Sequence, residues 1–196
     1  MFDLDGTIFD TNVNIATALS KEYDVNVTKE DIKAYDITEV KTEVLQLSDI
    51  MHVNEFFAKY HHEIIYEAAL IDGFMEYYNK IKSQGNKVLF VTARHPRQYT
   101  KTFHHLESFG IDLNEDNLHC SSNNDYRKAK KLNINPKFYH LFETLQLDKN
   151  KVIVYEDKPD TLDFFYDNNV QTIKVNQPYN NDSKCHLAID NFKELL

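Results

Sequence analysis

The chain has 196 residues, of which 42% are hydrophobic, so it can form one packed domain with an insertion but is short for two independent domains. Its formal net charge of -9 argues against a stable nucleic-acid complex, because surfaces that track phosphates need clustered Lys and Arg. A small phosphorylated metabolite needs only a local positive pocket and remains possible. Cys120 and Cys185 form no disulfide framework or metal motif, and no apolar run reaches membrane length. We therefore expect a reduced, cytoplasmic protein without a membrane partner, whose oligomeric state the sequence leaves open.

The chain begins with a short apolar segment that carries Asp3 and Asp5 and runs into Gly6 and Thr7. Residues two apart in a strand point to the same side, so a strict strand would place both carboxylates together at the carboxyl edge of a sheet. Such a pair suits phosphoryl transfer, since one carboxylate attacks phosphorus and the other moves protons. Only two residues precede Asp3, so we expect a first strand with few ladder hydrogen bonds, stabilised by its neighbours and by metal.

Residues 11–72 carry a series of amphipathic helical patterns and no strand-like run. Thr28 and Asp31 have the spacing of a capping box at a helix start. Two helical stripes flank it, marked by Ile15, Leu19 and Tyr23 and by Phe56, Phe57, Tyr60, Ile64 and Ile65. These patterns predict an all-helical cap inserted after the first strand.

From residue 73 onward, short apolar runs alternate with helical patterns. The runs cover 88–91, 118–120, 152–155 and 172–175, and the helical patterns cover 74–84, 98–109, 137–146 and 160–168. Continuous hydrophobicity is typical of strands covered on both faces, and this alternation predicts a doubly wound parallel sheet. We expect an α/β fold whose core comprises residues 1–10 and 73–196, with the helical cap at 11–72.

Polar residues follow two of the expected strands. Thr92 and the amide of Ala93 come after the run 88–91 and could bind a phosphate where the next helix begins. Glu156 and Asp157 come after the run 152–155 and offer the oxygen ligands that Mg²⁺ prefers. Asp160 could join that site or could stabilise the dipole of the next helix.

This order of motifs, strand-DxDGT, strand-Thr and strand-Glu-Asp, resembles the haloacid dehalogenase superfamily over the whole chain. The resemblance implies that Asp3 is a nucleophile, Asp5 a general acid and base, and Thr92 a phosphate ligand. It also implies a Mg²⁺ site formed by Asp157 with Glu156, by Asp3 and by the backbone carbonyl of Asp5. The acid at position 5 indicates a phosphatase or phosphomutase, because dehalogenase members lack an acid at that place.

The superfamily also uses a lysine that neutralises the phosphate. Three candidates, Lys128, Lys130 and Lys131, lie in DYRKAKKLNINP, before the helix expected at 137–146. Lys131 is nearest to the expected place and is our predicted phosphate ligand. Leu132 stands where related sequences carry a proline after the lysine.

Three segments, 34–38, 65–68 and 176–180, carry a narrower resemblance to bacterial and phage proteins grouped with cytosolic type C 5'(3')-deoxyribonucleotidases. This resemblance implies a nucleoside monophosphate as substrate. Tyr35, Tyr66 and Tyr179 could then contact the base, or they could belong to the core of the cap. The alternatives are a phosphatase of sugar phosphates or phosphoglycolate, a nucleic-acid 3'-phosphatase, and a non-catalytic phosphate-binding regulator.

Overall fold

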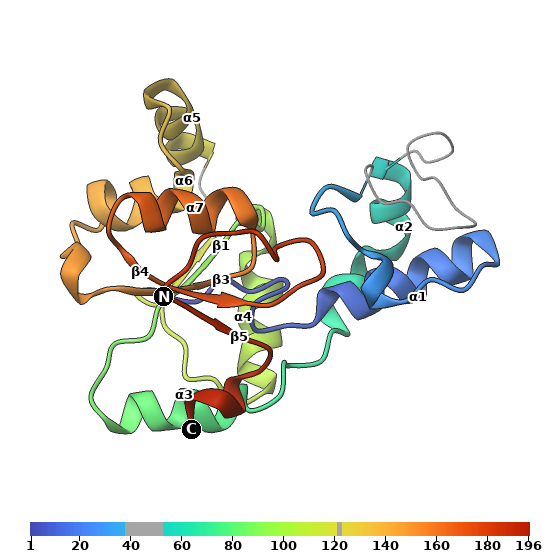
Figure 1. The fold of residues 1–196 in the computed structure, drawn as a ribbon, viewed down its shortest axis with the longest axis horizontal. Helices are drawn as coiled ribbons and strands as arrows, with labels where there is room; N and C mark the ends of the chain where they lie inside the picture. The colour runs from blue at the N-terminus through green and yellow to red at the C-terminus, as the bar shows by residue number, and fades with distance from the viewer. Residues whose placement is uncertain (38–52, 121–122) are drawn as a thin grey trace.

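The computed structural model describes residues 1–37, 53–120 and 123–196. A parallel sheet lies between two layers of helices, and a separate helical lobe stands beside it (Figure 1). This arrangement confirms the predicted α/β class with a helical cap after the first strand. Thr38, which belongs to one of the nucleotidase-like segments, lies outside the described residues. Of the helices in the described ranges, none is both long and apolar enough to cross a membrane.

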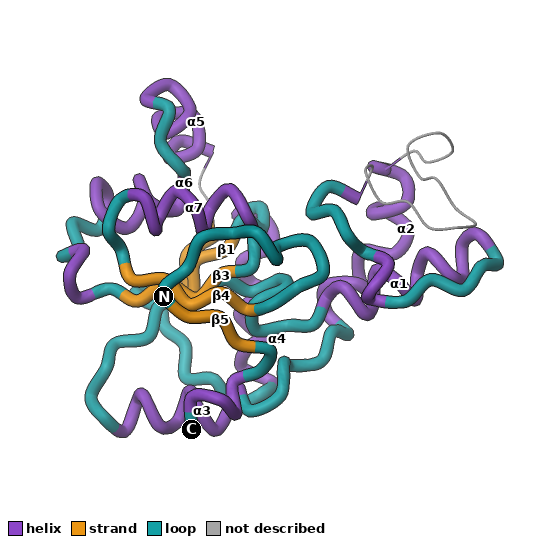
Figure 2. The backbone as a smooth tube through the Cα atoms, viewed as in Figure 1, coloured by secondary structure: helices purple, strands orange, loops and turns teal. Residues whose placement is uncertain are grey.

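The sheet consists of two parallel ladders with the N-terminal segment between them (Figure 2). Strand β1 (Phe90–Thr92) pairs with β2 (Leu118–Cys120). Strand β4 (Gln171–Val175) lies between β3 (Ile153–Glu156) and β5 (Leu187–Ile189). Because these connections run from one parallel strand to the next, the carboxyl ends of the strands meet at one edge.

Residues 1–3 join the two ladders although they form no extended strand. Phe2 makes isolated parallel bridges to Phe90 and to Tyr155. The amide of Phe2 donates to the carbonyl of Leu89 over 2.8 Å, and the amide of Asp3 donates to the carbonyl of Tyr155 over 3.0 Å. This segment is therefore hydrogen-bonded on both sides and occupies the middle of the sheet.

Each face of the sheet has its own hydrophobic core. On one face, Phe2, Phe90 and Tyr155 pack with Phe74 and Phe192 beneath α3 (Phe74–Ser83) and α4 (Tyr99–Ser108). The opposite face packs beneath α6 (Pro136–Tyr139) and α7 (Pro159–Asp167), with core members Met1, Leu89, Val91, Phe138, Leu141, Val154 and Phe165. The alternation of Met1 and Phe2 between these cores follows the two-residue period of extended chain.

The predicted helices and strands of the core agree with the structure to within about two residues, with three differences. The helix expected at 137–146 is α6 followed by a π-helical turn at His140–Thr144. Helix α5 (Asn123–Leu132) was not predicted, because among its described side chains only Ala129 is buried and no apolar stripe marks it. Strand β5 was also missed; two of its three residues, Leu187 and Ala188, are exposed.

The helical lobe consists of α1 (Thr11–Tyr23) and α2 (Val53–Tyr66), which pack around a separate hydrophobic cluster. The capping-box residues Thr28 and Asp31 begin only a single 3-10 turn, Lys29–Asp31. The segment that enters the lobe and the segment that leaves it lie side by side, because Phe9 and Leu70 form an antiparallel bridge. The division into 1–10 with 73–196 and 11–72 stays a prediction.

Candidate active site

Three buried carboxylates meet at the carboxyl edge of the sheet. Asp3 follows Phe2 in the middle of the sheet, Glu156 is the last residue of β3, and Asp157 comes directly after it. All three residues are buried, and they offer carboxylate oxygens that lie within 4.8 Å of one another. The two motifs predicted to converge therefore do converge, because neighbouring parallel strands end side by side.

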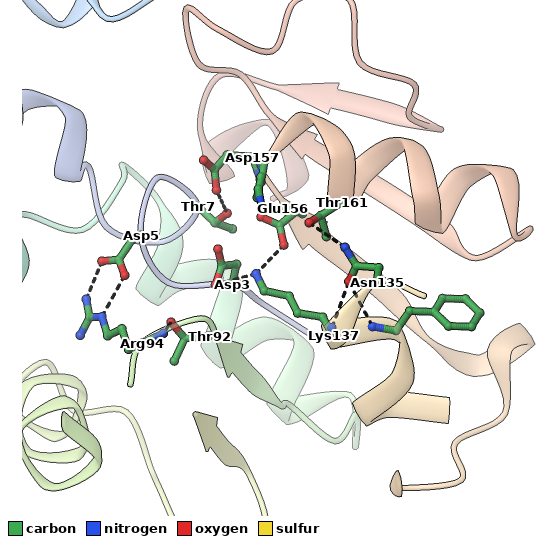
Figure 3. Close-up of polar contacts among 12 residues, drawn as sticks. Asp3, Asp5, Thr7, Thr92, Arg94, Asn135, Lys137, Glu156, Asp157 and Thr161 are labelled. Atoms are coloured by element: carbon green, nitrogen blue, oxygen red, sulfur yellow. Dashed lines mark hydrogen bonds and ion pairs between the residues drawn. The ribbon is translucent and has the colours of Figure 1, made fainter. Parts of the chain in front are cut away.

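Lys137 lies between two of these carboxylates (Figure 3). Its Nζ is 2.9 Å from Asp3 Oδ1 and 2.6 Å from Glu156 Oε2. Asn135 fixes the start of α6, because its Oδ1 accepts hydrogen bonds from the amides of Lys137 and Phe138 at 3.0 and 3.3 Å. The first turn of α6 thus directs a buried ammonium group at the carboxylate cluster.

This lysine is not the one predicted. Lys128, Lys130 and Lys131 are all exposed on α5, whereas Lys137 is only 7% exposed and contacts Asp3. The lysine beside Asp3 is therefore Lys137 and not Lys131. The sequence carried a signal for it, because Lys137 and Leu141 are four residues apart and share the buried face of the predicted helix.

Asp157 is held by two hydroxyl groups. The Thr7 hydroxyl donates to Oδ1 over 2.7 Å, and the Tyr179 phenol donates to Oδ2 over 2.5 Å. Tyr179 was considered as a contact for a nucleobase, but its hydroxyl is engaged with the carboxylate cluster. Its ring packs edge-on against Tyr35 with a centroid distance of 5.6 Å.

Burial raises the pKa of Asp3 to about 7, and the nearby charge of Glu156 adds to the shift. Burial also raises the pKa of Asp157 to about 7, with a further contribution from the charge of Asp3. Burial alone would lower the pKa of Lys137, but the charges of Asp3 and Glu156 raise it. Ionised Asp3, Glu156 and Asp157 would therefore carry three negative charges beside one buried ammonium.

That surplus of negative charge fits a divalent cation. Asp3 Oδ1 is buried, and among the described residues the cation that it contacts is Lys137, which it shares with Glu156. Asp3 and Asp157 offer hard oxygen ligands of the kind that bind Mg²⁺. Glu156 belongs to the same cluster, although its Oε2 pairs with Lys137 and its Oε1 accepts two backbone amides.

Asp5 does not join the cluster. Arg94 holds its carboxylate with two hydrogen bonds, from Nε to Oδ2 over 2.9 Å and from Nη2 to Oδ1 over 2.6 Å. The guanidinium is buried between the rings of Phe9 and Tyr66, whose centroids lie 5.7 and 5.5 Å away. Figure 3 shows Asp5 facing Arg94 while Asp3 faces Lys137. The expectation that both carboxylates share one side is corrected.

The remaining predicted residues surround the cluster. Thr92 is buried at the end of β1, where its Oγ1 accepts the amide of Arg94 over 3.2 Å. Ala93 is exposed and lines a cavity that also contains Asp3. Asp160 lies in the first turn of α7 and pairs with Lys158 at 3.2 Å, in agreement with a role at the helix N-terminus.

A sequence model of haloacid dehalogenase-like hydrolases matches residues 1–175. The chain belongs to this family. Its fold is similar to that of a haloacid dehalogenase-like hydrolase from Bacteroides fragilis, with 14% identity, a TM-score of 0.65 and coverage of 100% of this chain and 97% of that one. It also resembles a predicted phosphoglycolate phosphatase from Haemophilus somnus, with 17% identity, a TM-score of 0.64 and coverage of 99% and 94%. For the β-phosphoglucomutase of Clostridium difficile, the identity is 17%, the TM-score 0.57 and the coverage 100% and 91%.

No protein of curated function matches the sequence. The named structures indicate the fold, and their names refer to hydrolase, phosphatase and phosphoglucomutase activities rather than to nucleotidases.

Gly6 lies in the turn beside Asp157, where its φ is +78° and there is no room for a side chain. A Cβ added there would lie 2.4 Å from Asp157 Oδ2 and 3.0 Å from the Tyr179 hydroxyl. Gly85 is a matched control, since its φ is +81° and nothing lies within 4 Å of an added Cβ.

We predict that Gly85→Ala costs only left-handed backbone strain, roughly 1–2 kcal/mol, and that Gly6→Ala costs clearly more because Asp157 must move. Urea unfolding of both variants measures the difference. Equal losses of stability in the two variants would contradict the close packing around Gly6.

We also predict that Mg²⁺ stabilises the fold more at pH 8 than at pH 5.5. The folded pKa values of Asp3 and Asp157 are about 7, above their unfolded values, so the metal-free protein loses stability as the pH rises from about 4 through 7. The same deprotonation prepares both carboxylates for a cation, and binding at a hundredfold excess over Kd is worth about 2.7 kcal/mol. Melting temperatures with and without Mg²⁺ at both pH values test this expectation.

The control is Asp157→Asn, which removes one ligand and should abolish most of the Mg²⁺ effect at pH 8. A Mg²⁺ effect that is the same at both pH values, or that survives in Asp157→Asn, would exclude this cluster as the metal site.

Proposed function

We propose that the chain is a Mg²⁺-dependent phosphomonoester hydrolase that forms an aspartyl-phosphate on Asp3. The observation that carries this proposal is the position of Asp3, a buried carboxylate that lies beside a buried ammonium and opens onto a cavity. Asp3, Asp157 and the backbone carbonyl of Asp5 would hold the metal, with Glu156 beside them. A bound Mg²⁺ supplies positive charge that keeps Asp3 ionised and offsets the charge of the phosphoryl oxygens.

In the first step, a carboxylate oxygen of Asp3 bonds to phosphorus while the bond from phosphorus to the alcohol oxygen breaks. Asp5 enters this step protonated, gives its proton to that departing oxygen, and is left as the carboxylate that Arg94 holds. Lys137, Thr92 and the amide of Ala93 bind the phosphoryl oxygens. Lys137 also compensates the negative charge of the buried Asp3 carboxylate. In the second step, Asp5 takes a proton from water, the water oxygen bonds to phosphorus, and the bond to Asp3 breaks.

Two substrate classes are compatible with this chemistry. The phosphoglycolate phosphatase and phosphoglucomutase among the similar structures favour a sugar phosphate or phosphoglycolate. A nucleoside monophosphate is the second candidate, favoured by Tyr35, which comes from the helical lobe and lines the cavity with Asp3. A nucleic-acid end and a purely regulatory role have weaker support, because the net charge is -9 and the carboxylate cluster is intact.

We predict that the protein hydrolyses at least one ester in a panel of sugar phosphates, phosphoglycolate, nucleoside monophosphates and 3'-phosphorylated oligonucleotides, and only with Mg²⁺. Asp3→Asn should abolish turnover while the circular dichroism spectrum stays unchanged, because the nucleophile is lost and the side-chain volume is kept. Phosphate release measures both. An active Asp3→Asn protein would disprove the nucleophile, and an inactive wild type across the panel would favour the regulatory alternative.

The clamp by Arg94 predicts a second effect on turnover. Arg94→Met should lower kcat by about 10- to 100-fold with little change in KM, because Asp5 loses its orientation and acid–base catalysis contributes about 10²- to 10⁴-fold in enzymes. Arg94→Lys should restore part of the rate by offering one hydrogen bond instead of two. Arg97, an exposed arginine three residues further on, provides the control Arg97→Met, which should leave kcat unchanged. A normal kcat in Arg94→Met would contradict the role of the clamp.

A further inference from the structure

The cavity above Asp3 extends well beyond the place of a phosphoryl group. Its volume is about 470 Å³, within the range of pockets that bind drug-sized ligands. One end contains Asp3, Ala93 and Lys137, and the other is formed by α5 and by the start of α7. A substrate as small as phosphoglycolate would leave most of this space to water. The size of the cavity therefore favours a much larger alcohol portion.

Aromatic side chains from two separate elements line the cavity. Tyr35 comes from the helical lobe and Tyr126 from α5, and they are 50% and 53% exposed. Lys158 lies 5.1 Å from the ring centroid of Tyr35. Half-exposed rings beside a cavity are surfaces on which planar bases stack. The cavity therefore offers one aromatic ring beside the carboxylate cluster, that of Tyr35, and a second on α5, that of Tyr126.

A cation also lines the far part of the cavity. Lys137 is neutralised by Asp3 and Glu156, and Lys158 pairs with Asp160 at 3.2 Å. Lys130 projects from α5 into the cavity lining, and no carboxylate of the described residues pairs with it. After a phosphoryl group has bound at Lys137, Lys130 is thus available for a second anionic group.

We propose that the substrate is a nucleotide-sized phosphomonoester that carries a second anionic group, such as a nucleoside 3',5'-bisphosphate, and that Lys130 binds this second group. This inference rests on the proposed phosphatase function. The base would stack on Tyr35 or Tyr126, and the phosphate to be removed would lie at Asp3. The leaving alcohol is then a nucleoside monophosphate, and the reaction is the two-step transfer described above.

The test compares adenosine 3',5'-bisphosphate with adenosine 5'-monophosphate. Wild-type protein should show a KM about tenfold lower for the bisphosphate, as expected for one additional charge-assisted hydrogen bond. Lys130→Gln should remove this difference by raising the KM for the bisphosphate about tenfold with kcat unchanged. Lys128→Gln is the matched control, because Lys128 is exposed on the same helix but outside the cavity lining.

Binding to the Asp3→Asn protein, measured by calorimetry with both nucleotides in the presence of Mg²⁺, separates this inference from the proposed function. Tighter binding of the bisphosphate that depends on Lys130 supports the site even if no ester is hydrolysed. Equal binding of the two nucleotides overturns the inference, even if p-nitrophenyl phosphate is hydrolysed with Mg²⁺. An equal effect of Lys128→Gln and Lys130→Gln would also overturn it, because that result requires only a general loss of positive charge.

Discussion

The ion pairs of Lys137 with Asp3 and Glu156 are the interactions on which the rest of the site depends. Removing carboxylates from water is costly, and a buried charge is tolerated only when it is paired. Here one ammonium serves a cluster of three carboxylates, and the pKa values of Asp3 and Asp157 are raised first by burial and then by the neighbouring negative charges. The cluster is therefore built to receive a further cation.

The polypeptide around the cluster is constrained on several sides. The loop 176–180 contacts the turn after Asp5, because Gln177 Nε2 donates to the carbonyl of Gly6 over 2.7 Å. In the same loop, Asn180 Nδ2 donates to the carbonyl of Asp157 over 2.8 Å, and the phenol of Tyr179 reaches the carboxylate of that residue. Neutral donors thus orient Asp157 without neutralising it.

Much of the fold and part of the site could be predicted from the sequence, for identifiable physical reasons. Runs of apolar residues mark buried strands, and acids directly after them must lie at the sheet edge, so Asp3, Glu156 and Asp157 were predictable as a group. Lys137 was missed because it lies inside a helical pattern, where a lysine is normally a solvated residue. Helix α5 was missed because its charged surface carries no apolar stripe, although Lys130 lines the cavity from it.

The orientation of Asp5 shows where a rule of periodicity stops applying. The two-residue period that predicted Asp3 and Asp5 on one side requires extended backbone, but the chain bends at Leu4 and turns from Gly6 onward. The side chain of Asp5 therefore does not follow the alternation of the strand, and it contacts Arg94, which lies two residues after Thr92. Asp3 and Asp5 are consequently held by different partners, Lys137 and Arg94. The two groups can therefore be oriented separately, which a continuous strand would not allow.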